Sequence, residues 1–180
     1  MRVTCGSDNL ELNICGSNAV LLEQLQSCDQ GSILLGKEFE EPAEFYTLII
    51  HHANTRHSFG VGILCPGYGL RPHVLPLAAE RSILVGFANR IAGVRIDTRG
   101  LEFQHNLDAL FYGFIPVPSQ GVVLAVIETG AVAVDPAGRK LWTHTEDIVT
   151  DWRTDGEWLD LDFLRAGSVR LHVRTGAVSR

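Results

Sequence analysis

The chain has little positive charge. It carries 15 Lys and Arg against 21 Asp and Glu, which gives a formal net charge of −6 and a pI of about 5.6. Nucleic-acid binding usually needs a basic face, and an anionic membrane surface attracts basic segments. We therefore expect neither nucleic acid nor a membrane as a partner.

Long hydrophobic runs are also missing. The first 13 residues have no apolar run behind their charge, so they do not form a signal peptide. The longest apolar stretch, residues 121–134, contains Glu128 and two glycines and is too short to span a bilayer. These features predict a cytoplasmic protein.

Complete catalytic and cofactor motifs are absent as well. The four cysteines form no C-x-x-C pair, so a zinc site built on cysteine pairs is not expected. The thiols are expected to be reduced, and at least Cys15 and Cys65 are interpreted as buried small side chains. There is no G-x-S-x-G and no phosphate loop. We expect no cofactor, and the absence of these motifs favours a protein that is not an enzyme.

What the sequence does contain is short strands. Helical patterns occur only at Ser17–Gln26, where a strand fits as well, and at Leu75–Arg81. Elsewhere short alternating runs are separated by Gly, Pro, Asn and Asp, which is typical of an all-β protein. A chain of 180 residues with 46% hydrophobic residues is enough for one domain with a core.

Three segments repeat one pattern: an apolar strand, a turn, an alternating strand, a second turn and a further strand. They are residues 83–105, 123–144 and 158–176. Asp97 and Asp135 lie 38 residues apart, and the glycines at 100, 138 and 176 keep the same spacing. Four short strands with a period of about 38 residues are typical of a propeller blade.

The turn in each repeat explains the spacing. Asp before a turn favours an Asx or type I turn, and the glycine three residues later is expected to supply a positive φ. The aromatic residues Phe103 and Trp142 follow the turn and are expected to pack between blades.

The middle repeat, AVDPAGRKLW, resembles the repeat of quinoprotein-type (PQQ-like) β-propellers. Ala133, Asp135, Gly138 and Trp142 match that pattern, whereas the loop is one residue shorter and the usual Thr before Gly is absent. The resemblance covers roughly residues 83–176. It implies blade structure without implying a cofactor, because the repeat also occurs in scaffold and interaction proteins.

Two parts are predicted: an N-terminal β segment, residues 1–72, and a propeller-like repeat region, residues 73–180; a single domain is the alternative. The Pro- and Gly-rich stretch at residues 65–72 marks the boundary. Three blades do not close a propeller. The N-terminal segment could therefore supply a divergent fourth blade, or the array could be open, or two copies could complete each other. A β-sandwich is the alternative fold.

The most metal-like cluster is His51, His52 and His57. Neighbouring strand residues point to opposite faces, so a turn near Ala53 and Asn54 must bring His57 back across from one of the other two. The other interpretation is a polar hairpin tip.

The acidic segment 147–163 is interpreted as structural. Asp155 and Gly156 are typical of a hairpin turn. Alternation then places Trp158, Asp160 and Asp162 on one strand face, opposite an array of basic residues on the next strand: Arg170, His172 and Arg174. An exposed Trp beside acidic groups is a candidate partner surface.

The sequence therefore favours a non-enzymatic interaction or scaffold module that binds an unknown protein partner or associates with itself. The alternative is a small-ligand or metal-binding protein, or an enzyme, that uses the histidine cluster.

Overall fold

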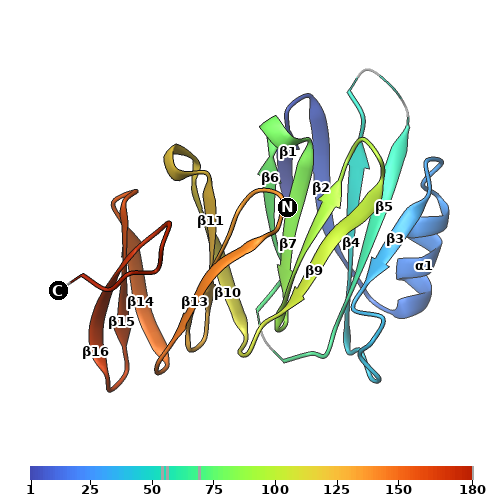
Figure 1. The fold of residues 1–180 in the computed structure, drawn as a ribbon. Helices are drawn as coiled ribbons and strands as arrows, with labels where there is room; N and C mark the ends of the chain where they lie inside the picture. Colours follow the sequence, from blue (N-terminus) through green and yellow to red (C-terminus); the bar gives the residue numbers. More distant parts are fainter. Residues whose placement is uncertain (54, 56, 69, 180) are drawn as a thin grey trace. The chain divides into compact units, whose positions relative to one another are not determined.

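A computed structural model describes residues 1–53, 55, 57–68 and 70–179. Nearly all of its regular structure is β (Figure 1). The elements, in chain order, are β1 (Arg2–Cys5), β2 (Asp8–Cys15), α1 (Asn18–Gln26), β3 (Ser32–Leu35), β4 (Glu44–His51), β5 (Ser58–Cys65), β6 (His73–Leu77), the 3₁₀ turn η1 (Ala78–Glu80), β7 (Ser82–Phe87), β8 (Arg90–Arg95), β9 (Gly100–Asn106), β10 (Phe111–Val117), η2 (Pro118–Gln120), β11 (Val122–Ile127), β12 (Gly130–Val134), β13 (Lys140–Thr145), β14 (Val149–Thr154), β15 (Trp158–Phe163) and β16 (Gly167–His172). Within the described ranges, no helix is long and apolar enough to cross a membrane.

The strands of the described residues form four sheets. The N-terminal sheet has the order β1-β2-β4-β5-β3, with β3 parallel to β5. The other three are meanders, which we name repeat sheet 1 (β6–β9), repeat sheet 2 (β10–β13) and repeat sheet 3 (β14–β16). Sheets of consecutive antiparallel strands at a repeated spacing make this an all-β, propeller-like repeat fold. The fold class predicted from the sequence is confirmed.

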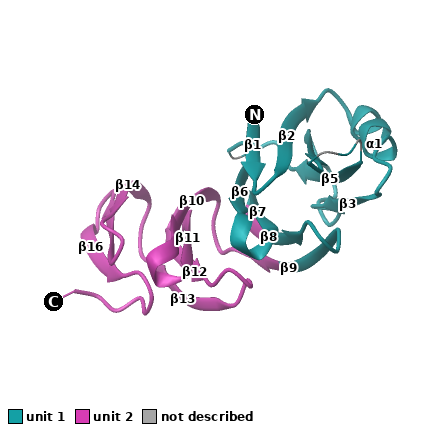
Figure 2. Cartoon of the chain, turned by 90° about the horizontal axis from the view of Figure 1, so that it is seen from above, with its two compact units in different colours: residues 1–88, 92–103 teal, residues 89–91, 104–180 magenta. Residues whose placement is uncertain are grey.

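The chain divides into two compact units (Figure 2). Unit 1 comprises residues 1–88 and 92–103, and unit 2 comprises residues 89–91 and 104–180. The boundary predicted after residue 72 falls between β5 and β6, where the N-terminal sheet gives way to repeat sheet 1. The independence of residues 1–72 as a domain stays a prediction.

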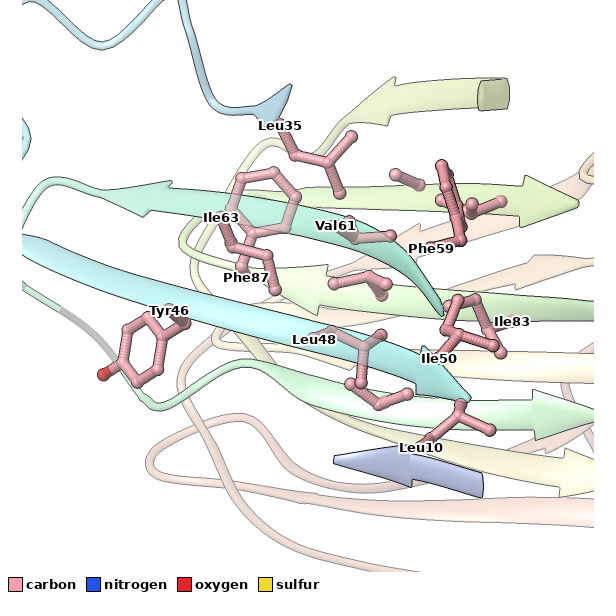
Figure 3. Close-up of a cluster of buried hydrophobic side chains, with 14 of the residues drawn as sticks. Leu10, Leu35, Tyr46, Leu48, Ile50, Phe59, Val61, Ile63, Ile83 and Phe87 are labelled. Atoms are coloured by element: carbon pink, nitrogen blue, oxygen red, sulfur yellow. The ribbon is translucent and has the colours of Figure 1, made fainter. Parts of the chain in front are cut away.

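The core of unit 1 lies between the N-terminal sheet and repeat sheet 1 (Figure 3). One face of the N-terminal sheet contributes fully buried side chains such as Leu48, Ile50 and Ile63. Repeat sheet 1 contributes Ile83 and Phe87 to the same cluster. Two sheets that share one apolar core in this way pack as neighbouring layers. The N-terminal sheet thus serves as a packing partner for a blade, although its parallel strand and helix depart from the blade pattern.

The helix α1 covers the other face of the N-terminal sheet. Ser17 is its N-cap and accepts a hydrogen bond from the Val20 amide at 3.3 Å. Its buried residues Leu21 and Leu25 pack directly on Gly62 of the sheet. A Cβ at Gly62 would lie only 2.7 Å from the Leu25 Cδ1 atom, so the helix needs a glycine there. The cap and this close approach select a helix over the strand that the sequence also allowed.

The helix predicted at Leu75–Arg81 is wrong. Its first three residues belong to β6, which pairs with β7, and only Ala78–Glu80 form a single 3₁₀ turn that ends at Arg81 with φ of +49°. Repeat sheet 2 has an equivalent 3₁₀ turn, η2, which ends at Gly121 with φ of +61°. Strand pairing thus outweighs the weak helical signal.

The Asp-containing turns match the prediction in one repeat and differ in the other. Gly138 has φ of +85°, as expected. In the first repeat Arg99, with φ of +56°, takes the left-handed position, and Gly100 begins β9 instead. The prediction of a positive φ at Gly100 was therefore wrong by one residue, because the Asp97 turn is followed by an earlier return into the strand.

The aromatic residue after each turn has an equivalent place in both repeats. Trp142 lies opposite Ala133 in the ladder of β12 and β13. The ring of Phe103 lies against Gly93 of β8, where a Cβ would stand only 2.1 Å from the ring. Trp142 also packs between sheets of unit 2, because its indole N–H donates to the Val173 carbonyl at 2.8 Å and its ring contacts Gly176.

Candidate functional site

The outer side of repeat sheet 3 carries the predicted partner surface. Along β15, Leu159, Leu161 and Phe163 are buried in the core of unit 2, and the residues between them point to the opposite side. The strand register extends this side onto β14 and β16. We call it the charged face; its members are Asp151, Arg153, Trp158, Asp160, Asp162, Ser168, Arg170 and His172.

A ladder of opposite charges crosses the charged face. The Asp160 carboxylate lies 3.5 Å from the Arg153 Nε atom and 3.6 Å from the Arg170 Nε atom. Arg170 also pairs with Asp155, and Asp162 accepts a hydrogen bond from the Ser168 hydroxyl. Exposed pairs of this kind contribute only about 0.2–1 kcal/mol each to stability. Their larger effect is to fix the positions of the guanidinium groups.

Trp158 lies between two other side chains of the charged face, Arg170 and His172. The Arg170 Cζ atom lies 5.8 Å from the centre of the indole, and the His172 ring meets it edge-on at 5.3 Å. The Trp158 side chain is half-buried, so part of the ring faces solvent. Trp and Arg are the residue types that most often dominate binding energy at protein interfaces.

The hairpin predicted at Asp155 and Gly156 is present. The Asp155 Oδ1 atom accepts hydrogen bonds from the backbone amides of Trp158 at 2.8 Å and Glu157 at 3.0 Å, and these bonds lower the pKa of Asp155. Gly156 has φ of +94°. The Asp side chain therefore fixes the turn that begins β15 and positions Trp158 as its first residue.

The histidine cluster takes a different form. The His52 amide donates to the His57 carbonyl at 3.1 Å, so the chain does turn back as expected; Asn54, on which that turn was predicted, lies outside the described residues. His52 faces the Asp8 carboxylate at 3.4 Å, whereas His57 pairs with Asp29. His51 ends β4 and is exposed.

Each histidine thus has its own surroundings. The Ser58 amide and the His57 imidazole hold the pKa of Asp29 well below its usual range. In the part of the chain that the structure describes, no group of three or more His, Cys, Asp or Glu side chains is placed to hold a metal ion. A metal site at His51, His52 and His57 stays a prediction.

A buried polar network was missed by sequence reasoning. The carboxylate of Asp8, whose side chain is only 6% exposed, contacts His52, the Ala53 amide at 3.2 Å and the Arg81 guanidinium at 3.6 Å. It joins the β1–β2 turn, the end of β4 and the η1 turn. These residues are far apart in the sequence, and the one local signal is an Asp at the start of an alternating strand.

All four cysteines are free and buried, as predicted for Cys15 and Cys65. The Cys5 thiol donates to the Ser82 carbonyl at 3.6 Å, and burial raises its pKa. Burial, followed by the neighbouring Glu44 carboxylate, raises the pKa of Cys65 to about 12. Such thiols are poor nucleophiles at neutral pH.

Comparisons with known proteins bear on the fold alone. No known protein family and no curated protein matches the chain. The structure is similar to Kuenenia stuttgartiensis hydrazine synthase, with a TM-score of 0.53 and 12% identity over 74% of this chain and 42% of that chain. A second similar structure is the β-propeller domain of Myceliophteria thermophila Cps50 (Swd1), with a TM-score of 0.49 and 10% identity over 79% of this chain and 54% of that chain. This chain therefore spans about half of each matched chain.

Proposed function

We propose that the protein is a non-enzymatic interaction module that binds a protein partner through the charged face of repeat sheet 3. The observation that carries this proposal is the arrangement of Trp158 on β15 between Arg170 and His172 on the neighbouring strand β16. A partner that covers the indole and the guanidinium would gain the contacts that usually dominate interface energy.

The charges of this face define the partner's chemistry. Acidic and basic groups alternate, since Asp160 lies between Arg153 and Arg170. Such a surface favours a partner with complementary charges around an apolar or aromatic contact for Trp158. A second copy of the chain is included among these partners, so self-association is part of the proposal.

We also propose that the repeats are of the quinoprotein (PQQ-like) type, used here as a scaffold. The Asp135 side chain accepts a hydrogen bond from the Arg139 amide at 2.8 Å and so fixes the turn, and the ring of Trp142 lies beside Ala133. These contacts give the residues that match the repeat a structural role. They support a scaffold role for the repeats.

The test uses a random peptide library displayed on phage and selected on the immobilised full-length chain. Peptides enriched on the wild type are expected to bind at least about 30-fold more weakly to Trp158→Ala, the effect of losing a hot-spot residue. Trp152→Ala is the matched control, because Trp152 points to the other side of the same sheet and contacts Tyr112. Peptides that bind both variants like the wild type would overturn the proposal, provided that circular dichroism shows both variants folded.

The alternative function is a small-ligand or metal-binding protein, or an enzyme, at His51, His52 and His57. Its support is that the turn pairs the backbones of His52 and His57, and that each imidazole lies beside a carboxylate of the kind that orients metal-binding histidines. Native mass spectrometry with added zinc tests it. One ion per chain that is lost in His57→Ala would support the alternative, and a bare chain would refute zinc binding.

A further inference from the structure

A second surface, in unit 1, has the form of a peptide-binding groove. It has a volume of about 440 Å³ and lies between α1, β3 and the start of β9. Figure 2 shows β3 between α1 and β9. Its lining is mostly aliphatic; the side chains used below are Leu22, Leu25, Ser32, Leu34, Lys37 and Leu101.

The floor of the groove is an edge strand. β3 is the last strand of the N-terminal sheet and pairs with β5 on one side only. The Gly60 amide donates to the Gly31 carbonyl, which sets the phase of the parallel ladder. Alternate residues of a strand bond to the same neighbour, so Ile33 and Leu35 pair with β5. The backbone N–H and C=O groups of Ser32 and Leu34 therefore point outward, where another strand could pair with them.

The walls on the two sides of this edge are both apolar. On one side lie Leu22 and Leu25 of α1, with Leu22 42% exposed. On the other side lies Leu101 of β9, 48% exposed. Because side chains of an added strand alternate in direction, one set would contact α1 and the other would contact Leu101. A folded helix could not satisfy the outward backbone groups, whereas an extended peptide could.

The groove has one charged residue in its lining, Lys37, which follows β3. No carboxylate of the described residues forms an ion pair with it, although the chain as a whole has a net charge of −6. A cation at one end of an apolar groove favours a peptide with a carboxylate at that end.

We propose that this groove binds an extended peptide, which pairs with β3 as an additional strand, places aliphatic side chains against both walls and sets an acidic residue beside Lys37. Main-chain hydrogen bonds to Ser32 and Leu34 supply affinity, and the two walls and Lys37 select the sequence. The groove is separate from the charged face, so the two surfaces are tested independently.

The probe is a fluorescein-labelled heptapeptide, Thr-Val-Leu-Val-Thr-Glu-Glu, titrated against the full-length chain by fluorescence anisotropy. Two companion peptides accompany it. One carries N-methyl groups on alternate central amides and cannot form the ladder, and the other ends in two lysines. The proposal expects saturable binding of the first peptide and at least about tenfold weaker binding of both companions.

Four variants locate the binding. Ser32→Pro removes an outward N–H without removing a bond to β5, and Leu101→Glu charges one wall; each is expected to weaken binding about tenfold or more. Lys37→Glu is expected to reverse the preference between the Glu-ended and Lys-ended peptides. Val20→Glu is the control, because Val20 is an exposed residue of the same helix outside the groove.

Three results would overturn the proposal. They are no binding of the probe at millimolar concentration, equal binding of the N-methylated peptide, and binding that neither Ser32→Pro nor Leu101→Glu changes. A dimer in sedimentation equilibrium that Ser32→Pro dissociates would replace the peptide with a second copy of the chain.

Discussion

Replacement of Trp142 by Phe tests the packing of the repeats in unit 2. The Trp142 indole N–H donates to the carbonyl of Val173, a fully buried residue, at 2.8 Å, and the ring lies against Gly176. Phe keeps an aromatic ring on β13 but has no N–H to donate and is smaller than the indole.

The expected loss of stability has two parts. A buried carbonyl left without a donor costs about 1–3 kcal/mol, and the missing part of the indole removes about 1 kcal/mol of burial because the side chain is half-buried. We expect Trp142→Phe to lower the free energy of unfolding by about 2–4 kcal/mol, measured by urea denaturation followed by far-UV circular dichroism.

Trp152→Phe is the matched control. Trp152 is 36% exposed and contacts Tyr112 with a centroid distance of 6.1 Å, so its replacement should cost less than about 1 kcal/mol. If the two substitutions cost the same, or if Trp142→Phe is as stable as the wild type, the indole does not join the two repeat sheets as we argue.

Three further predictions concern unit 1. Asp8→Asn should lower the free energy of unfolding by about 2 kcal/mol, because the buried carboxylate loses its charge-assisted contacts; urea denaturation indistinguishable from the wild type would show that the network adds no net stability. The Arg95 guanidinium lowers the pKa of Asp97 from 3.8 to about 2, so its contribution to stability is complete above about pH 4 and is lost as the pH falls towards 2. Thermal melts across this range should depend less steeply on pH in Asp97→Asn, and an unchanged profile would contradict the pairing. Cys65, with its pKa raised to about 12, should react with iodoacetamide at pH 8 on the order of a hundredfold more slowly in the native chain than in urea, as mass spectrometry of the labelled peptides would show.

The repeat region could be predicted because its determinants are local. An Asp before a turn, a residue with positive φ and an aromatic residue opposite a small one recur within a few positions, as at Asp135, Gly138 and Trp142. The N-terminal sheet is less predictable. Its parallel pairing of β3 with β5 joins residues about 28 positions apart, such as Ile33 and Val61, with α1 and β4 between them. No turn motif specifies such a pair.

The candidate sites also differ in how far the sequence predicts them. Strand alternation alone places Trp158 and Asp160 on one face with the basic residues of the next strand, and the register pairs Trp158 with His172 and Asp160 with Arg170. The carboxylate partners of the histidines could not be found in this way. Asp8 reaches His52 and Asp29 reaches His57 across separate turns, so only the folded arrangement of β2, β4 and β5 brings them together.

The second strands of the three repeats differ in a way that defines the charged face. Every residue of β7 and β11 is buried, whereas β15 alternates between buried and half-buried positions. Repeat sheet 3 therefore has one face for a core and one for water. Another apolar sheet placed on it would remove the water around Asp160, Asp162 and Arg170 without supplying polar groups in its place, at a cost of several kcal/mol. We therefore expect any partner on this face, including a second copy of the chain, to bring complementary charges and not a further apolar blade.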